Sequence, residues 1–508
     1  MRFATGLARR NLLAVAVAAL LGGCAAVQAP LQASAPATAP RPAANRPMNV
    51  LLIIADDQNA RLGTYGAPVR SPNVDRFARE GVRFEHAYAN FPLCGPSRAS
   101  FLSGVRPNTI GAKMDFMKFR CAMPDVTTLP QYFKDRGWFA GRIGKAYHQG
   151  VPSDIGRSGP DDAASWTQVV NPRGHDKDVE GDVLNLTPGT GLGRALAFLE
   201  GDKDDADYTD GKVATAAIEM MKANANKPFF ITVGFYRPHV PEIVPKKYFD
   251  LYPMRDIPAP DATPEELAAL VPTSRLTANP HFGMTPEQQR QMIRAYSAAT
   301  TFMDAQVGRV LESLDKLDLR DNTIVVFMGD HGFMLGQHGQ WTKSMLFEES
   351  ARTALIVRAP QVQGGRASAK PVELVDLYPT ITDLAGLPRY ARNEGSSLVP
   401  LLERPDDPQW TKPALSQVFG GRSVRTERYR YTEWDQGRAG RELYDYTTDP
   451  AEKHNLAADP AHAATIARLK AMLPAGPVEA RRVHPEDGGQ RYGSRAEAEA
   501  AQLKCPES

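Results

Sequence analysis

The strongest constraint on the fold is a set of three continuous apolar segments, residues 49–55, 228–235 and 323–329. A strand that is apolar at nearly every position is buried on both faces, which is typical of a largely parallel sheet covered by helices. In open sheets of this kind, ligands bind beyond the carboxyl ends of the strands. The polar residues that follow each segment are therefore the first candidates for a functional site.

Acidic residues follow two of the three segments. Asp56 and Asp57 come directly after the first, and Asp330 and His331 come directly after the third. Adjacent carboxylates repel each other unless a cation lies between them, so the pattern favours one metal ion with oxygen ligands from both strand ends. A solvated turn after each strand is the alternative. The imidazole of His331 is also a softer ligand than Ca²⁺ usually selects.

Cys94 lies where a segment with strand and loop character gives way to a helix. It opens the sequence Cys-Gly-Pro-Ser-Arg, and residues 97–100 suit the first turn of a helix, so Cys94 is expected just ahead of the helix. Free backbone N–H groups and the helix dipole both favour an anion at this position. An ordinary buried or redox-active cysteine is the alternative.

Further polar residues follow other expected strands. Lys145 and His148 come at and after the end of one strand, which delivers them to the same edge of the sheet. His239 follows the second apolar segment and lies between Pro238 and Pro241, which stiffen its loop. For both histidines, an imidazole with no catalytic role in a loop is the alternative.

The chain resembles the type I sulfatase family. The matching segments are Asn-Val-Leu-Leu-Ile-Ile-Ala-Asp-Asp at 49–57, Ser-Pro-Asn-Val-Asp at 71–75 and the motif that begins at Cys94, in that order and spacing. The match continues through Leu-Pro-Gln-Tyr-Phe-Lys at 129–134 and Gly-Lys-Ala-Tyr-His at 144–148. It covers nearly all of residues 48–470 and looks closest to the iduronate-2-sulfatase branch.

This resemblance implies an α/β fold of the alkaline-phosphatase type. We expect a large mixed, mostly parallel sheet flanked by helices, plus a smaller C-terminal α+β subdomain with an antiparallel sheet. The catalytic domain is expected over residues 47–405 and the C-terminal subdomain over residues 406–508, because the connection between them is rich in Pro and Asp. Residues 284–315 predict a long helix with one core-facing stripe, and residues 151–211 predict loops around the substrate mouth.

The resemblance also implies a modified nucleophile and a metal ion. In the family, the cysteine at the position of Cys94 is oxidised to formylglycine, an aldehyde whose hydrate attacks sulfur. A formylglycine-generating maturation enzyme is therefore an expected partner. Ca²⁺ is the expected ion, with Mg²⁺ and Mn²⁺ left open. The implied metal ligands are Asp56, Asp57, Cys94, Asp330 and His331.

The remaining roles are implied in the same way. The implied catalytic residues are Cys94, Arg98, Lys145, His148, His239 and Lys343. The cationic side chains among them stabilise the sulfate oxygens. His239, helped by Lys343, protonates the leaving oxygen, and His148 assists release of the sulfate. The branch suggests a sulfated sugar as substrate, in particular a 2-O-sulfated uronate such as iduronate 2-sulfate.

Residues 1–24 have the pattern of an export signal. Arginines precede an apolar run that is too short for a comfortable membrane span, and the run leads into Leu-Gly-Gly-Cys, which is typical of lipoprotein acylation on Cys24. Cleavage near Ala25 or Ala26 without a lipid is the alternative. We expect an exported bacterial protein, periplasmic or anchored to the outer membrane, with residues 25–46 as a flexible tether.

Charge and cysteine content argue against a nucleic-acid-binding protein and against a fold held together by disulfides. The chain has a net charge of +2, and loss of the signal removes three arginines and no acidic residue, which leaves −1. Nothing in this balance favours nucleic acid, so an anionic ligand has to be held by a local cluster. Beyond Cys24 only Cys94, Cys121 and Cys505 remain, which is no disulfide framework, although a bridge between Cys121 and Cys505 stays open.

Other functions fit parts of the pattern. The same cations suit phosphate, so a phosphodiesterase or phosphonate monoester hydrolase of the same fold is the first alternative. A phosphatase would more typically have Ser or Thr as nucleophile together with zinc ligands, and Cys94 argues against it. A catalytically inactive, surface-anchored glycan-binding lipoprotein would require Cys94 to stay a thiol.

Overall fold

The computed structural model of the protein describes residues 46–111, 115, 118–473, 482–484 and 489–491. The predicted export signal, the predicted lipidation site Cys24, the predicted tether up to residue 45 and Cys505 all lie outside these residues. The bridge between Cys121 and Cys505 therefore stays open. Within the described residues, no helix combines the length and the apolar character that crossing a membrane requires.

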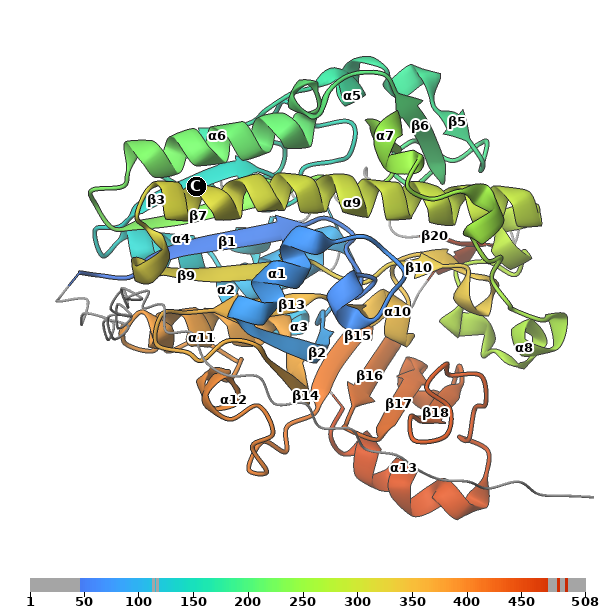
Figure 1. The fold of residues 1–508 in the computed structure, drawn as a ribbon. Helices are drawn as coiled ribbons and strands as arrows, with labels where there is room; N and C mark the ends of the chain where they lie inside the picture. Colours follow the sequence, from blue (N-terminus) through green and yellow to red (C-terminus); the bar gives the residue numbers. More distant parts are fainter. Residues whose placement is uncertain (1–45, 112–114, 116–117, 474–481, 485–488, 492–508) are drawn as a thin grey trace, which may run out of the picture. The chain divides into compact units, whose positions relative to one another are not determined.

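A nine-stranded sheet forms the centre of the fold (Figure 1). Its strands, in spatial order, are β12 (Arg352–Thr353), β2 (Val82–Tyr88), β13 (Leu355–Arg358), β9 (Thr323–Gly329), β1 (Asn49–Ala55), β7 (Phe229–Phe235), β3 (Phe139–Gly144) and β4 (Gln168–Val170), with β14 (Arg366–Glu373) paired to β2. From β9 to β4 all neighbours are parallel, whereas β13 runs antiparallel to β9 and β2. The predicted fold class is confirmed.

Helices cover both faces of the sheet. One core joins the sheet to α1 (Pro72–Glu80), α6 (Thr209–Ala223) and α9 (Pro286–Lys316), and the other joins it to α2 (Cys94–Ser103), α4 (Leu129–Lys134) and α11 (Leu377–Leu384). Along β1, Leu51 and Ile53 pack in the first core, and Leu52 and Ile54 pack in the second. Burial of each such side chain stabilises the fold by about 1.5–3 kcal/mol, which explains the unbroken apolar segment.

Helix α9 confirms the long helix predicted from the apolar stripe. Its N-terminus is fixed by a capping box, in which Thr285 accepts from the backbone N–H of Gln288 and the Gln288 side chain accepts from the backbone N–H of Thr285. The stripe faces the core, with Met292, Tyr296 and Met303 all fully buried. In Figure 1, α9 runs alongside α6 on the same side of the sheet.

The prediction of loops over residues 151–211 was wrong in part. This segment contains β4, α5 (His175–Asp178), β5 (Leu184–Asn185) and β6 (Ala197–Gly201). Strand β4 extends the main sheet, and β5 and β6 form a small sheet with β8 (Glu242–Pro245). These elements are two to five residues long. Such short pieces carry no readable periodicity, because their tertiary contacts rather than their own sequence stabilise them.

A four-stranded antiparallel sheet follows near the C-terminus. It consists of β15 (Ala414–Val418), β16 (Gly421–Arg425), β17 (Tyr429–Trp434) and β18 (Arg441–Asp445), and α13 (Ala463–Lys470) packs against it. The sequence indicated three of these strands and missed β15, which directly follows the Pro-rich connection. The domain boundary at residue 405 stays a prediction. The remaining elements are α3 (Pro107–Ile110), α7 (Lys246–Phe249), α8 (Pro264–Ala269), α10 (Glu348–Ala351), α12 (Val399–Glu403), β10 (Met334–Leu335), β11 (Trp341–Thr342), β19 (Arg482–His484) and β20 (Gly489–Arg491).

Candidate active site

The sheet register brings four strand ends to one edge. Ala55 of β1 pairs with both Gly329 of β9 and Phe235 of β7, and Gly144 of β3 pairs with Gly234 of β7. The residues that follow these positions therefore start at nearly the same level. This edge holds Asp56, Asp57, Lys145, His239, Asp330 and His331.

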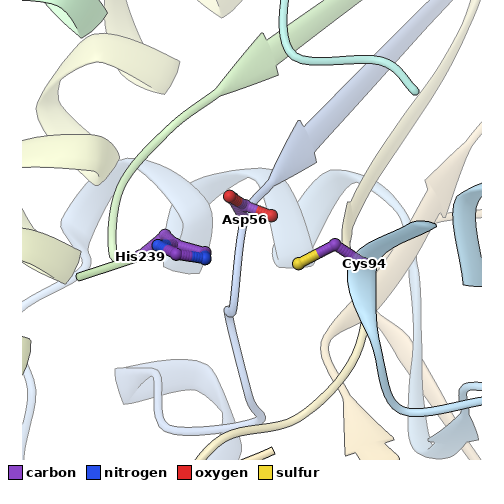
Figure 2. A group of neighbouring side chains, drawn as sticks. All are labelled: Asp56, Cys94 and His239. Atoms are coloured by element: carbon purple, nitrogen blue, oxygen red, sulfur yellow. The ribbon is translucent and has the colours of Figure 1, made fainter. Parts of the chain in front are cut away.

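Helix α2 adds Cys94 to this edge. Cys94 is the first residue of the helix rather than the residue ahead of it, and its side chain is buried. In Figure 2 the thiol of Cys94 and the imidazole of His239 point toward each other on either side of Asp56. Ligand-type atoms of these three residues lie within 4.8 Å of one another. The predicted nucleophile thus lies against the strand ends.

Arg98 and Lys145 form an inner layer behind the carboxylates. The Arg98 guanidinium donates to Asp330 Oδ2 at 2.9 Å, to Asp56 Oδ1 at 3.0 Å and to the backbone carbonyls of Lys145 and Ala146. Lys145 Nζ donates to Asp56 Oδ2 at 2.6 Å. Both cationic side chains are fully buried. In this structure they hold the carboxylates in place, and their predicted contact with sulfate stays a prediction.

These cations set the charge of Asp56. Burial by itself would raise the pKa of Asp56, but Lys145, His239 and Arg98 outweigh it and hold the pKa well below the ordinary value. In return, Asp56 raises the pKa of Lys145 against the effect of burial. Asp56 is therefore an ionised carboxylate with both oxygens fixed by hydrogen bonds.

Asp57 has a different environment. Its φ is +62°, a conformation that a residue with a side chain rarely adopts, and its backbone N–H donates to Asp330 Oδ1 at 3.0 Å. Tyr296 Oη donates to the Asp57 carbonyl at 2.7 Å, and Lys343 Nζ donates to Asp57 Oδ1 at 2.6 Å. Burial raises the pKa of Asp57, and Lys343 only partly offsets this. Tyr296, which the sequence assigned to the core alone, also fixes this backbone.

His331 presents a lone pair to the same point. Its Nδ1 lies 2.8 Å from the carbonyl of Gly332, which can only accept, so the proton of a neutral ring is on Nδ1. Its Nε2 lies 3.2 Å from Cys94 Sγ and 3.4 Å from Asp57 Oδ1. A histidine with this tautomer is suited to bind a metal ion through Nε2.

The donor set fits a divalent metal ion. Carboxylate oxygens of Asp56, Asp57 and Asp330 lie within 4.8 Å of one another, and so do the ligand atoms of Asp57, Cys94 and His331. Asp57 Oδ2 is buried and has no hydrogen-bond partner among the described residues, which is costly unless a cation or a water satisfies it. Hard oxygen ligands suit Ca²⁺ or Mg²⁺. The five predicted ligands therefore form one candidate metal site.

An open cavity borders part of the candidate site. It has a volume of about 920 Å³, and the predicted site residues that line it are Asp57, Cys94, His148, His239 and Lys343. Lys343 Nζ lies 3.2 Å from Cys94 Sγ. Burial raises the pKa of the Cys94 thiol well above its ordinary value, and the charge of Asp56 adds to this. All ten predicted site residues thus lie at this edge, and only half of them face the cavity.

His239 is held with one ring nitrogen toward the cavity side. Its Nδ1 lies 2.6 Å from the carbonyl of Val240 and therefore carries a proton, and its Nε2 lies 3.7 Å from Asp57 Oδ2. Nε2 carries a proton only when the ring is an imidazolium. Burial and Lys343 lower the pKa of His239 well below its ordinary value, and Asp56 only partly offsets this, so without a bound anion the ring is neutral and Nε2 carries a lone pair.

His148 lies beside an acid that sequence reasoning missed. Its Nδ1 is 3.6 Å from Asp115 Oδ1, and Asp115 also accepts from the backbone N–H of Gly95, next to Cys94. Burial lowers the pKa of His148 to about 4, although Asp115 opposes this. Asp115 lies in a segment without strand or helix pattern, so nothing in the sequence pointed to it. Arg194, another cation at the cavity wall, was missed for the same reason.

Sequence comparisons place this site in a known family. The sulfatase family profile matches residues 48–387, and the profile of the N-sulphoglucosamine sulphohydrolase C-terminal region matches residues 336–476. A sulfatase of Formosa agariphila is 32% identical over 446 residues, which cover 84% of this chain and 86% of that protein. Iduronate 2-sulfatase of Mus musculus is 32% identical over 523 residues, which cover 83% and 93%.

Solved structures share the fold. A protein in complex with its substrate D-glucosamine-2-N,6-O-disulfate has a TM-score of 0.67 at 22% identity and covers 84% of this chain and 97% of its own. Phosphonate monoester hydrolase from Silicibacter pomeroyi has a TM-score of 0.68 at 22% identity, with 84% and 94% covered. At these identities the likeness concerns the fold alone.

Fold and site together define an ester hydrolase of the alkaline-phosphatase-like class, with acids, bases and a helix N-terminus at one sheet edge. The family match and the relatives at 32% identity narrow this further: the chain belongs to the sulfatase family. It is a sulfuric ester hydrolase. The predicted resemblance to type I sulfatases, near the iduronate 2-sulfatase branch, is confirmed.

Proposed function

We propose that this sulfatase acts on a sulfated carbohydrate through a formylglycine made from Cys94. The observation that carries the proposal is the position of Cys94, which starts helix α2 at the cavity wall and lies within 4 Å of His331, Lys343 and Asp57. Formylglycine, once hydrated, supplies one hydroxyl that attacks sulfur and a second hydroxyl whose deprotonation releases the sulfate. A formylglycine-generating enzyme has to act first.

The residues around Cys94 have separable tasks in this proposal. Lys343 holds positive charge at the cavity wall, where it stabilises an anionic sulfate group, and Arg98 and Lys145 keep the carboxylates in position. For protonation of the leaving oxygen His239 has to be an imidazolium, a form that the negative charge of a bound sulfate ester favours. Its Nε2 then donates a proton to the leaving oxygen as the S–O bond breaks. His148, neutral at ordinary pH because burial lowers its pKa to about 4, accepts a proton during release of sulfate.

The proposal includes a divalent ion, with Ca²⁺ expected, bound by the carboxylates at the strand ends. Asp56, Asp57, Asp330, His331 and the nucleophile at Cys94 would hold it. When bound, it supplies positive charge that stabilises the sulfate oxygens and favours deprotonation of the nucleophile. Three carboxylates and three cationic side chains nearly cancel here, so a divalent ion gives the site a net positive charge toward an anionic ester.

For the substrate, we propose a 2-O-sulfated uronate such as iduronate 2-sulfate. The support is the 32% identity to iduronate 2-sulfatase over most of both chains, together with a cavity of about 920 Å³, large enough for a sugar residue. Arg194 at the cavity wall gives a second positive charge, suited to the carboxylate of a uronate. We further propose that the protein is exported and attached through Cys24.

Mass spectrometry of the tryptic peptide 84–98, from protein made in its own host, tests the nucleophile. The peptide mass should show the thiol of Cys94 replaced by an aldehyde or its hydrate, and the same preparation should release sulfate from iduronate 2-sulfate. An unmodified Cys94 in an active preparation would overturn the formylglycine mechanism. Release of sulfate from other sugars but not from the uronate would overturn the substrate alone.

A phosphonate monoester or phosphodiester hydrolase is the second candidate. The fold shared with phosphonate monoester hydrolase at a TM-score of 0.68 favours it, and the same cations suit phosphate. A direct comparison of kcat/KM for matched aryl sulfates and aryl phosphonates separates the two. We expect the sulfate to be preferred.

A further inference from the structure

The loop after β7 contains a buried arginine for which the mechanism above has no task. We propose that Arg237 is a positioning residue for His239, and that it sets the direction in which this acid delivers its proton. The inference rests on the proposed function, because it concerns the acid that serves the leaving oxygen. Arg237 does not line the cavity, and its side chain is only 2% exposed.

The guanidinium of Arg237 ties its own loop together. Nη1 donates to the backbone carbonyl of His239 at 2.8 Å, and Nε donates to the carbonyl of Ile243 at 3.3 Å. Nη2 donates to Asp176 Oδ2 at 3.2 Å. One rigid, planar group thus connects the histidine, the start of β8 and an acid on α5. A lysine at this position has a single nitrogen and cannot span all three acceptors.

Two acids anchor this arrangement at the N-terminus of helix α6. Asp176 Oδ1 accepts from the backbone N–H and the hydroxyl of Thr209, both at 2.7 Å. Asp210 accepts from the backbone N–H groups of Tyr236 and Arg237, both at 2.9 Å. Asp176 and Asp210 are nearly inaccessible to solvent. The histidine loop is therefore fixed to a 15-residue helix rather than to neighbouring loops.

This fixation has a chemical consequence. With Nδ1 bound to the Val240 carbonyl, only Nε2 of His239 is available to the leaving oxygen. As the S–O bond breaks, the electron pair stays on that oxygen, and the proton moves to it from Nε2. A displacement of about 1 Å costs on the order of 100-fold in rate when a transfer depends on alignment. A leaving group that is already stable as an anion needs no proton and is insensitive to the displacement.

The test compares two aryl sulfates with Arg237→Lys and Asp176→Asn. One substrate is 4-nitrophenyl sulfate, a good leaving group, and the other is 4-methoxyphenyl sulfate, a poor one. We expect kcat for the poor leaving group to fall about 10- to 100-fold, a partial loss of the roughly 10²- to 10⁴-fold that general acid catalysis contributes, and kcat for the good one to fall less than about 3-fold. His239→Ala gives the upper limit of this selective loss.

The matched control is Arg430→Lys, because Arg430 is also a buried arginine paired with a carboxylate, and it does not line the cavity. It should lower the thermal midpoint without selective loss for the poor leaving group. If Arg237→Lys does not fold, Asp176→Asn carries the test. Equal losses for both substrates, or none, would overturn the inference and leave the proposed function intact. Absence of wild-type turnover on both would overturn the two together.

Discussion

Two buried clusters of charge in this molecule contain similar groups and differ in how completely they are satisfied. The site cluster consists of Asp56, Asp57, Asp330, Arg98, Lys145 and Lys343. The C-terminal cluster joins α10 to the antiparallel sheet and consists of Glu348, Glu452, Arg425, Arg430, Tyr88 and Tyr446. The first borders an open cavity, and the second does not.

In the C-terminal cluster every carboxylate oxygen has a partner. Glu348 accepts from Tyr88, Tyr446 and Arg430, and Glu452 accepts from Tyr446 and from the backbone N–H of Glu348, and pairs with Arg430 at 2.8 Å. In the site cluster, Asp57 Oδ2 has no hydrogen-bond partner among the described residues. Among the described residues, the one group of the C-terminal cluster without a hydrogen bond is a donor, Arg425 Nε, and the acceptors of this cluster are all paired. An unpaired acceptor, as in the site cluster, instead retains binding capacity for a cation.

The largest expected difference between the clusters is in activity. Cys94→Ala should lower kcat/KM for any sulfate ester by at least about 10⁴-fold, because removal of a nucleophile has an effect of this order. The free energy of unfolding should change by no more than about 1–2 kcal/mol, as for most small changes of a buried side chain. Steady-state kinetics and urea unfolding of the same preparation measure both.

Glu348→Gln should show the reverse. Removal of this charge leaves Arg425 and Arg430 buried without full compensation, which costs about 3–5 kcal/mol when one partner of a buried pair is lost. The folded fraction should keep its kcat/KM within about 3-fold, since the change lies outside the cavity wall. Urea unfolding monitored by fluorescence gives the free energy.

Glu349→Gln is the matched control for that variant. Glu349 is the next residue, and burial raises its pKa to about 7, so near neutral pH it is already about half in the neutral form that an amide resembles. It should destabilise the protein far less than Glu348→Gln. If Glu348→Gln and Glu349→Gln lowered the free energy of unfolding equally, the C-terminal cluster would not be the source of the stability lost in Glu348→Gln.

Metal removal should affect the site cluster alone. Dialysis against a chelator should lower the thermal midpoint and abolish turnover, and added Ca²⁺ should restore both. At a free ion concentration of 100 times Kd, binding stabilises the folded state by about 2.7 kcal/mol. Glu348→Gln should show the same response to Ca²⁺ as the wild type, and Asp57→Asn should show little. A midpoint that does not depend on the ion would contradict the metal site.

Much of the fold was predictable because local sequence specifies it. The apolar segments 49–55 and 323–329 became neighbouring strands, and parallel pairing then placed Asp56 and Asp330 at one edge. Short elements such as β4 were not predictable, because only tertiary contacts stabilise them.

The sequence predicted which residues form the candidate site but not how their side chains contact one another. Sequence placed Arg98 and Lys343 in one group, but whether a cation contacts a carboxylate from behind or faces the cavity depends on side-chain direction. The partners Asp115 for His148 and Asp176 for Arg237 were missed, because they come from segments far away in the chain with no pattern of their own.

The smallest expected effect is the loss of stability at low pH, and it tests the C-terminal cluster independently of activity. Burial would raise the pKa of Glu348, but Arg425 and Arg430 outweigh it and hold the pKa well below the ordinary value of 4.5. A carboxylate with a lowered pKa contributes stability above its unfolded value, and this contribution is lost as the pH falls below it. The slope from this one group should approach about 1.4 kcal/mol per pH unit below pH 4.5. Urea unfolding of wild type and Glu348→Gln between pH 3.5 and about 6 should give a difference in stability that is constant at the upper end and shrinks toward the lower. A difference independent of pH would show that the glutamate acts by shape rather than by charge.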